Sequence, residues 1–296
     1  MSSDSTGATG TYITAACLSE VGSRRDNNED AFVIADLTQS EIFTDSTELI
    51  DRRVGMDGIL LAVADGIGGA RAGEVASRMA VEQLADALIA PASKRPISDW
   101  LRASLRSVNR YIRSASINNP NFYGMGATIT AVVAHETGLI IGQVGDSRAY
   151  LIRDGQVQQL TKDQSMVQAL IDAGVITPEE SEKSPYRHVV LHALGVADDV
   201  EPEISAVALA RGDHLLLCSD GLSNKVGNVE MHDVVREAET TGAACARLVA
   251  LANERGGEDN ITVVLARFDG ERLPSVKTTL DRRIRVERLS TEKPLI

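Results

Sequence analysis

The sequence predicts a layered α+β domain in which helices cover an antiparallel sheet core. The sheet is indicated by apolar or alternating runs of strand length, two of which flank Asp154-Gly155 at a spacing typical of a hairpin. The helices are indicated by segments with apolar residues at helical spacing between the strand regions. With 296 residues, 43% of them hydrophobic, the chain is expected to form one main domain.

The first part of the chain is expected to contain three strands and two helices. The strands are predicted over residues 12–18, 31–36 and 58–64. Leu37–Asp57 is polar and irregular, so a mobile surface loop is expected. Apolar residues recur at helical spacing in Glu74–Ile89 and again after Ser98, which is a suitable N-cap for the second helix.

The remaining chain alternates strands with further helices. Strands are predicted over residues 128–134, 138–144, 149–153, 156–160, 215–219 and 260–268. Helices near 229–238 and 242–253 are expected to end at Gly256-Gly257. A helix over 164–173 stops at Gly174, and Thr177-Pro178 begins another. These two helices interrupt a strand region and predict a flap over about 164–194.

Four aspartates lie beside Gly or Asn at or near the ends of strand-like runs. They are Asp65, Asp146, Asp220 and Asp259. Carboxylates gathered at one sheet edge repel one another, and a hard cation removes that penalty. Oxygen ligands suit Mg²⁺ or Mn²⁺, and a glycine such as Gly66 lets its carbonyl approach as a further ligand. The pattern therefore predicts a divalent-metal site.

A second cluster precedes the strand at 31–36. It joins Arg25 to Glu29 and Asp30. An arginine here is suited to grip a phosphate in a bidentate manner, with the acids facing the metals. A surface ion pair is the alternative role for this arginine.

The amino-acid composition limits the classes of partner and the cellular setting that we expect for this protein. The net charge of −12 argues against a nucleic-acid groove. Three dispersed cysteines indicate neither a zinc site nor a disulfide framework. The N-terminus has no signal-peptide pattern, and no apolar run is long enough to span a membrane. A soluble, cytoplasmic monomer is expected.

The motifs, taken in order, resemble the metal-dependent protein phosphatases of the PPM or type 2C serine/threonine family, in its bacterial form. The matching segments are Arg25 to Asp30, Asp65-Gly66-Ile67-Gly68-Gly69, Gly126-Ala127-Thr128, Gly145-Asp146-Ser147, Ser219-Asp220-Gly221 and Gly257-Glu258-Asp259-Asn260. The resemblance implies a four-layer αββα sandwich, with a central antiparallel β-sandwich flanked by helices. It divides the chain into a flexible N-terminus at 1–11, a catalytic domain at 12–270 and a basic tail at 271–296.

The resemblance also implies the role of each site residue. Two Mn²⁺ or Mg²⁺ ions are expected on Asp65, the Gly66 carbonyl, Asp220 and Asp259, and a third on Asp146 together with Asp220. Asp30 would orient the attacking water, Glu29 would be a weaker candidate for a similar role, and Arg25 would bind the phosphate.

The chain departs from the family pattern at three positions. Ile67 stands where some members have a histidine thought to protonate the leaving group, so a metal-bound water is expected to donate that proton. Glu20 replaces a frequent aspartate, and Gln164 replaces a frequent histidine after Asp163.

The implied function is hydrolysis of phosphoserine and phosphothreonine on proteins, opposing serine/threonine kinases. One alternative is a partner-switching regulatory phosphatase for a single small protein. Another is a non-catalytic binding module on the same fold, which the intact aspartates disfavour. The tail is expected to be solvated or a short packed extension, and docking to an acidic partner or membrane surface is the sharper hypothesis.

Overall fold

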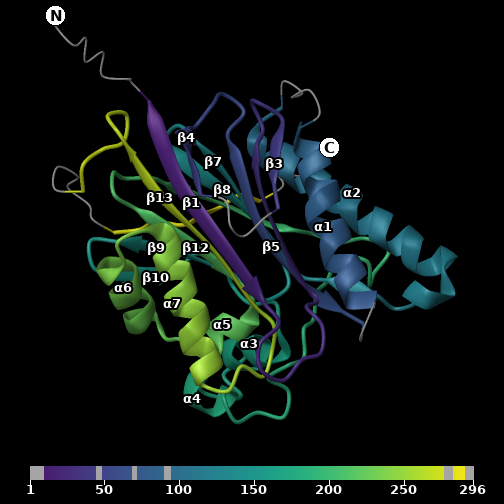
Figure 1. The fold of residues 1–296 in the computed structure, drawn as a ribbon. Coiled ribbons are helices and arrows are strands. Elements are labelled where there is room, and N and C mark those ends of the chain that lie inside the picture. The colour runs from purple at the N-terminus through teal and green to yellow at the C-terminus, as the bar shows by residue number, and fades with distance from the viewer. Residues whose placement is uncertain (1–9, 45–48, 69–71, 90–94, 277–282, 291–296) are drawn as a thin grey trace, which may run out of the picture.

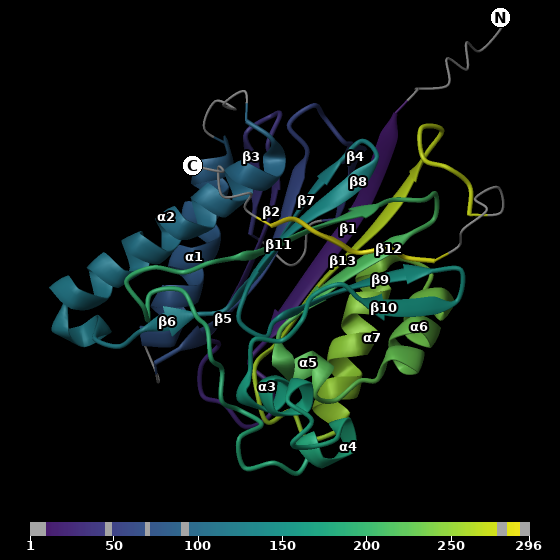
Figure 2. The same cartoon turned by 180° about the vertical axis from the view of Figure 1, so that it is seen from behind.

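The computed structural model describes residues 10–44, 49–68, 72–89, 95–276 and 283–290. Two antiparallel sheets pack face to face, and helices cover both outer faces (Figures 1 and 2). This arrangement confirms the predicted four-layer αββα sandwich. Residues 1–9 of the predicted flexible N-terminus lie outside the described residues, whereas Thr11 already begins the first strand.

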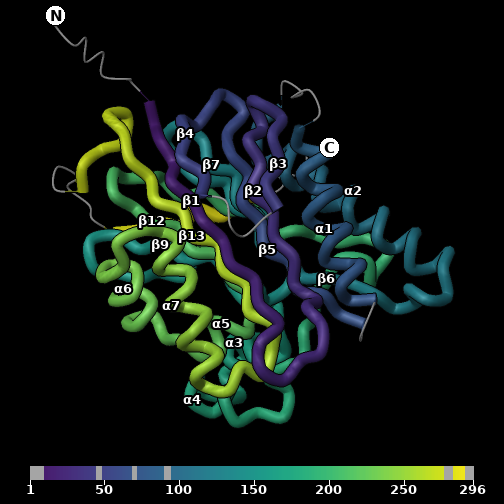
Figure 3. The backbone as a smooth tube through the Cα atoms, in the orientation of Figure 1, coloured from purple at the N-terminus to yellow at the C-terminus, as the bar shows by residue number. Residues whose placement is uncertain are grey.

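One sheet has six strands in the order β10-β9-β12-β13-β1-β4. Its strands are β1 (Thr11–Glu20), β4 (Ile50–Arg53), β9 (Arg148–Arg153), β10 (Gln156–Gln159), β12 (His214–Cys218) and β13 (Ile261–Gly270). β1 pairs with β13 from Thr11 opposite Gly270 to Glu20 opposite Ile261. The first and last long strands of the domain therefore run side by side (Figure 3).

The other sheet has eight strands, seven of them in the order β14-β11-β8-β7-β5-β2-β3, with β6 paired to β5. Its strands are β2 (Asp30–Asp36), β3 (Glu41–Phe43), β5 (Ile59–Ile67), β6 (Gly126–Ala127), β7 (Ile129–His135), β8 (Gly138–Val144), β11 (Glu203–Ala208) and β14 (Glu287–Arg288).

Alternation along β5 explains why its run is apolar on both faces. Ile59, Leu61 and Val63 join the core between the two sheets. Leu60 and Ala62 point the other way, into the core beneath the first helices. A strand with two buried faces has no place for an exposed polar side chain, so the polar residues of β5 appear only at its end.

The helices form the two outer layers. α1 (Ala72–Ile89) and α2 (Ile97–Asn118) cover the eight-stranded sheet, whereas α6 (Asn228–Glu237) and α7 (Thr241–Glu254) cover the six-stranded sheet. The short helices α3 (Met166–Asp172), α4 (Pro178–Ser181) and α5 (Asp220–Ser223) gather at one end of the sandwich (Figure 1). A 3-10 turn, η1, covers Pro120–Phe122.

Local chemistry places several helix ends where the sequence predicted them. α3 is followed by Gly174 at φ 67°, a conformation that favours glycine. In α4, Thr177 and Glu180 form a reciprocal capping box, with Pro178 in the first turn. α2 is different, because Pro96 and not Ser98 occupies the cap position, with no side-chain hydrogen bond. The fixed φ of proline suits this extended position, so the prediction of Ser98 as N-cap was wrong.

The segment Leu37–Asp57 was predicted as a loop, and the structure corrects this. It contains β3, which pairs with β2, and β4, which pairs with β1. Both strands are short and lie at sheet edges, where polar side chains face solvent and hide the strand pattern. Residues 45–48 of this segment lie outside the described residues.

The basic C-terminal segment packs onto the domain over residues 283–290. β14 pairs with β11, and Ile284 is buried. The Arg102 guanidinium on α2 donates to the Leu289 carbonyl at 2.6 Å. Lys277 and Arg282 of the basic tail lie outside the described residues. Within the described part of the chain, no helix has the length and hydropathy needed to cross a membrane.

Candidate metal centre

Four strand ends deliver aspartates to one end of the sandwich. Asp65 stands near the end of β5, and Asp146 lies between β8 and β9. Asp220 opens α5 directly after β12, and Asp259 comes just before β13. A fifth aspartate, Asp30, begins β2 directly opposite Asp65 in the sheet. The sequence-predicted carboxylates therefore converge, although up to 229 positions separate them along the chain, from Asp30 to Asp259.

Their electrostatic state reflects that convergence. Burial raises the pKa of Asp65 well above its usual value, and repulsion from Asp30, Asp220, Asp146 and Asp259 raises it further. Burial also raises the pKa of Asp30 and of Asp146, each to about 7. The pKa of Asp220 is raised by burial first and by Asp259 next. Such a cluster of buried carboxylates is stabilised by a nearby positive charge.

The donor set fits a hard divalent cation. Asp220 Oδ1 and Asp30 Oδ1 are buried oxygens without a hydrogen-bond partner among the described residues. Buried polar atoms are ordinarily partnered, so these two oxygens indicate an interaction that the protein does not itself supply. Position 66 has room only for a glycine, because a Cβ there would collide with the Gly73 carbonyl oxygen. Oxygen-only donors suit Mg²⁺ and Mn²⁺.

The carboxylates lie near one another, but their side chains are not arranged around a common ion position. As the described side chains stand, no three Asp, Glu, His or Cys groups are set to hold a metal ion jointly. Two of the candidate ligands have protein partners instead: Asp259 Oδ2 accepts from Arg25 Nη2 at 2.9 Å, and Asp220 Oδ2 accepts from Asn224 Nδ2 at 3.1 Å. The oxygen donors fit a cation by their chemistry, and an ion bound here would replace these two protein contacts.

The other predicted residues border this centre. Arg25 is half exposed, and its pair with Asp259 raises the arginine pKa. The Glu29 carbonyl accepts from the Gly66 N–H at 3.0 Å. Its side chain lies against Gly73, where an added Cβ would come within 2.8 Å of Glu29 Oε2. Arg25 and Glu29 thus lie beside the cluster but not within it.

Two residues that hold the site were not predicted as site residues from the sequence. Ser219 Oγ donates to Asp30 Oδ2 at 2.6 Å and accepts from the Thr262 N–H at 3.0 Å. Asn260 Oδ1 accepts from the Glu29 N–H at 2.8 Å, while its amide nitrogen donates to the Val21 and Asn27 carbonyls. Both residues adjoin a metal-site aspartate in the motifs, and that adjacency is the signal that could have found them.

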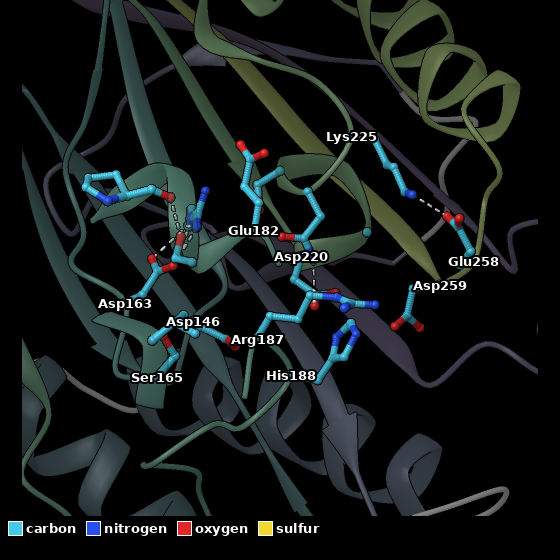
Figure 4. Close-up of a pocket in the computed structure, with 17 residues that line it drawn as sticks. Asp146, Asp163, Ser165, Glu182, Arg187, His188, Asp220, Lys225, Glu258 and Asp259 are labelled. Atoms are coloured by element: carbon cyan, nitrogen blue, oxygen red, sulfur yellow. Dashed lines mark hydrogen bonds and ion pairs between the residues drawn. The ribbon is translucent and has the colours of Figure 1, made fainter. Parts of the chain in front are cut away.

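A cavity of about 590 Å³ opens beside the carboxylates. Asp146, Asp220 and Asp259 line this cavity together with Arg187 and His188 of the flap (Figure 4). Neighbouring ion pairs join Arg148 to Asp163 and Lys225 to Glu258. The cavity is polar and open to solvent, and it can admit a phosphorylated side chain with its neighbouring backbone.

Comparison with known proteins agrees with this architecture. Residues 39–258 match the model of the protein phosphatase 2C family. The chain is 39% identical over 213 residues to the serine/threonine phosphatase Stp of Listeria monocytogenes, covering 71% of this chain and 84% of that protein.

Solved structures give the same result. The serine/threonine phosphatase PstP/Ppp of Mycobacterium tuberculosis superposes with a TM-score of 0.74 at 35% identity, covering 87% of this chain and 99% of that one. A PstP catalytic domain solved with two manganese ions has a TM-score of 0.73 at 34% identity, with coverage of 88% and 99%. The chain belongs to the protein phosphatase 2C family. It is a protein serine/threonine phosphatase, as the sequence resemblance predicted.

Proposed function

We propose that this enzyme removes phosphate from phosphoserine and phosphothreonine of several protein substrates, with two Mn²⁺ or Mg²⁺ ions at the aspartate cluster and a third beside it. The observation that carries the proposal is the convergence of buried aspartates whose unpartnered oxygens border an open cavity. When bound, such ions activate water and neutralise phosphoryl oxygens.

The position of each candidate ligand indicates which ion it would bind. Asp65, the Gly66 carbonyl, Asp220 and Asp259 would hold two ions. Asp146, with Asp220, would hold the third ion. The two-manganese PstP structure supports the first assignment by similarity.

The remaining residues would act on water and phosphate. Asp30 is fixed by Ser219, which leaves its second oxygen unpartnered and suited to orient a water molecule. Glu29 would support this acidic side of the site. Arg25, half exposed beside Asp259, would grip the phosphate as the substrate enters. Ile67 has no proton to give, so a metal-bound water would be the donor to the leaving oxygen.

The biological setting follows from the same reaction. We propose a cytoplasmic monomer that opposes one or more serine/threonine kinases. The polar cavity and the acidic net charge of −12 support protein substrates over nucleic acid.

The proposal is tested by hydrolysis of para-nitrophenyl phosphate and of a phosphothreonine peptide with Mn²⁺, Mg²⁺ or EDTA. We expect turnover of both substrates to require metal and to fall at least about 100-fold in Asp220→Asn, because a shared metal ligand is lost. Asp233→Asn, an exposed aspartate on α6, is the matched control and should retain activity.

One outcome would overturn the proposal. If the wild-type enzyme binds Mn²⁺ in a calorimetric titration but hydrolyses neither substrate, a general phosphatase is excluded. The single-substrate regulator would then be the better description.

A further inference from the structure

The Gly145-Asp146 turn is held by two glutamine side chains. The Gly145 N–H donates to Gln164 Oε1 at 2.8 Å. The Gly145 carbonyl accepts from the Gln164 N–H at 3.0 Å and from Gln143 Nε2 at 3.1 Å. Gly145 has φ 105°, and a Cβ there would come within 2.6 Å of the Thr128 side chain. Both backbone polar groups of Gly145, the residue before Asp146, are therefore hydrogen-bonded, and Gln164 supplies two of the three hydrogen bonds.

Gln164 is also the base of the flap. Its carbonyl accepts from the Leu191 N–H at 2.8 Å, and the Met166 N–H donates to the Val189 carbonyl at 2.8 Å. Ser165 and Val190 complete this short antiparallel stalk. The two ends of the flap are thus paired to each other where the flap meets the Asp146 turn.

The flap reaches into the cleft beyond this stalk. Its residues Glu182, Arg187 and His188 line the same cavity as Asp146 and Asp220 (Figure 4). We expect a protein substrate in the cavity to contact this flap wall, whereas a small aryl phosphate needs only the end near the carboxylates. The stalk provides a hydrogen-bonded route from that wall to the Asp146 turn.

We infer that Gln164 is a positioning residue that sets the Asp146 carboxylate and couples its cation affinity to the flap. The inference rests on the proposed role of Asp146 as the ligand of a third ion. Removing the Gln164 side chain deletes the bond to the Gly145 N–H and leaves the backbone bond in place. Hydrogen-bonded supports of metal ligands typically contribute a factor of about 10 to 100 in metal affinity.

The first test uses Gln164→Ala with Gln168→Ala as the matched control. Gln168 lies in α3, and its side-chain amide donates to Asp172 without touching the turn. Isothermal titration with Mn²⁺ should show the weakest site of Gln164→Ala loosened about 10-fold, with the tighter sites unchanged. Hydrogen exchange of the metal-free protein should show faster exchange at the Gly145 amide in Gln164→Ala only.

Coupling to the flap has its own readout. In the wild-type enzyme we expect the Mn²⁺ concentration for half-maximal rate to be lower with a phosphothreonine peptide than with para-nitrophenyl phosphate. We expect a peptide that stabilises the flap to raise the affinity of the ion that shares its support, because a coupling between two binding sites acts in both directions. Gln164→Ala should abolish this difference, and Gln164→Glu, which keeps an acceptor of the same length, should restore it.

The outcomes separate this inference from the proposed function. If Asp146→Ala weakens the third ion while Gln164→Ala behaves like Gln168→Ala, the positioning role is wrong and the metal site stands. If Asp146→Ala changes no Mn²⁺ binding, the third-ion assignment itself fails. Should Gln164→Ala fail to fold in circular dichroism, Gln164→Met decides, because it keeps the length of the side chain and removes the acceptor: lost coupling supports the role, and wild-type-like coupling overturns it.

Discussion

At the scale of single residues, the Arg25 guanidinium has two competing partners, the Asp259 carboxylate and the phosphate of the proposed substrate. Its guanidinium pairs with Asp259 at 2.9 Å, and the same group is the one that we propose binds the substrate phosphate. The pair is partly exposed, so its own stabilising contribution is small. With the proposed roles, substrate binding and metal binding would both weaken this ion pair, because the phosphate would attract Arg25 and the cation would attract Asp259.

Replacing Arg25 should separate its effect on phosphate binding from its effect on metal binding. In Arg25→Ala we expect kcat/KM for para-nitrophenyl phosphate to fall roughly 10- to 100-fold, since a charge-assisted bidentate contact is lost. Mn²⁺ affinity should stay equal or increase, because Asp259 loses its competing cation. Steady-state kinetics and calorimetry measure the two effects, with Arg24→Ala as the neighbouring control. A parallel loss of Mn²⁺ affinity would contradict this division of roles.

The clustering of the aspartates could be predicted because each stands in a short motif next to an apolar, strand-like run. Ser219 and Asn260 could not be assigned in the same way. Their roles depend on Asp30 and Glu29, which are more than 180 positions away in the chain and are brought close only by the pairing of distant strands. Gln164 was noted only as a departure, since its contact with Gly145 is a property of the folded flap.

At the scale of elements, the long strands and helices were predictable and the edge strands were not. β5 and β13 are buried on both faces, so their apolar runs are unmistakable. β3, β4 and β14 are short and carry polar side chains, and each depends on a neighbour for its conformation. β11 also went unpredicted, although it forms six residue pairs with β8. Its run, Glu203–Ala208, mixes serine and alanine with apolar residues and lacks a strong strand signature.

The C-terminal strand should contribute to stability without serving catalysis. Deleting residues 283–296 exposes the β11 edge, removes buried Ile284 and takes the Leu289 carbonyl from Arg102. We expect a loss of about 1–3 kcal/mol in the free energy of unfolding, measured with urea. Activity on para-nitrophenyl phosphate should persist at low temperature, because none of residues 283–290 lines the cleft cavity.

A shorter deletion of residues 291–296 is the control, since it leaves β14 in place. Equal stability of both truncations would show that the strand contributes nothing. Docking of the tail to an acidic partner or membrane surface stays a prediction, to be checked by partner recovery with the same truncations.

At the scale of the whole molecule, the metal-free enzyme carries an electrostatic penalty that depends on pH. The pKa of Asp146 is 3.8 when unperturbed and about 7 in the fold, mainly because of burial. Below both values the residue is protonated in either state and has no effect. As pH rises from about 4 to about 7 the unfolded chain loses its proton first, so stability falls across this window and then levels.

Asp146→Asn should remove the part of this dependence that comes from Asp146, whereas the raised pKa values of Asp30, Asp65 and Asp220 keep their own parts. In EDTA we expect the variant to be more stable than the wild-type enzyme at pH 8 and closer to it at pH 5, as measured by urea unfolding. Saturating Mn²⁺ should reverse the order at pH 8, because only the wild-type carboxylate gains from the cation. A difference in EDTA that does not change between the two pH values would contradict the raised pKa.

The pairing of β1 with β13 also governs when the enzyme can become active during its synthesis. The strand made first, Thr11–Glu20, lies between β4 and β13, and β13 ends at Gly270. A ribosome-bound chain that stops before β13 therefore lacks the central partner of its six-stranded sheet, and Asp259 has no strand to fix it in place. Such long-range closure makes folding slow relative to local helix formation. With Asp259 as a proposed metal ligand, we expect a nascent or prematurely ended chain to be inactive, since the same late segment would complete both the metal centre and the closure of the sheet.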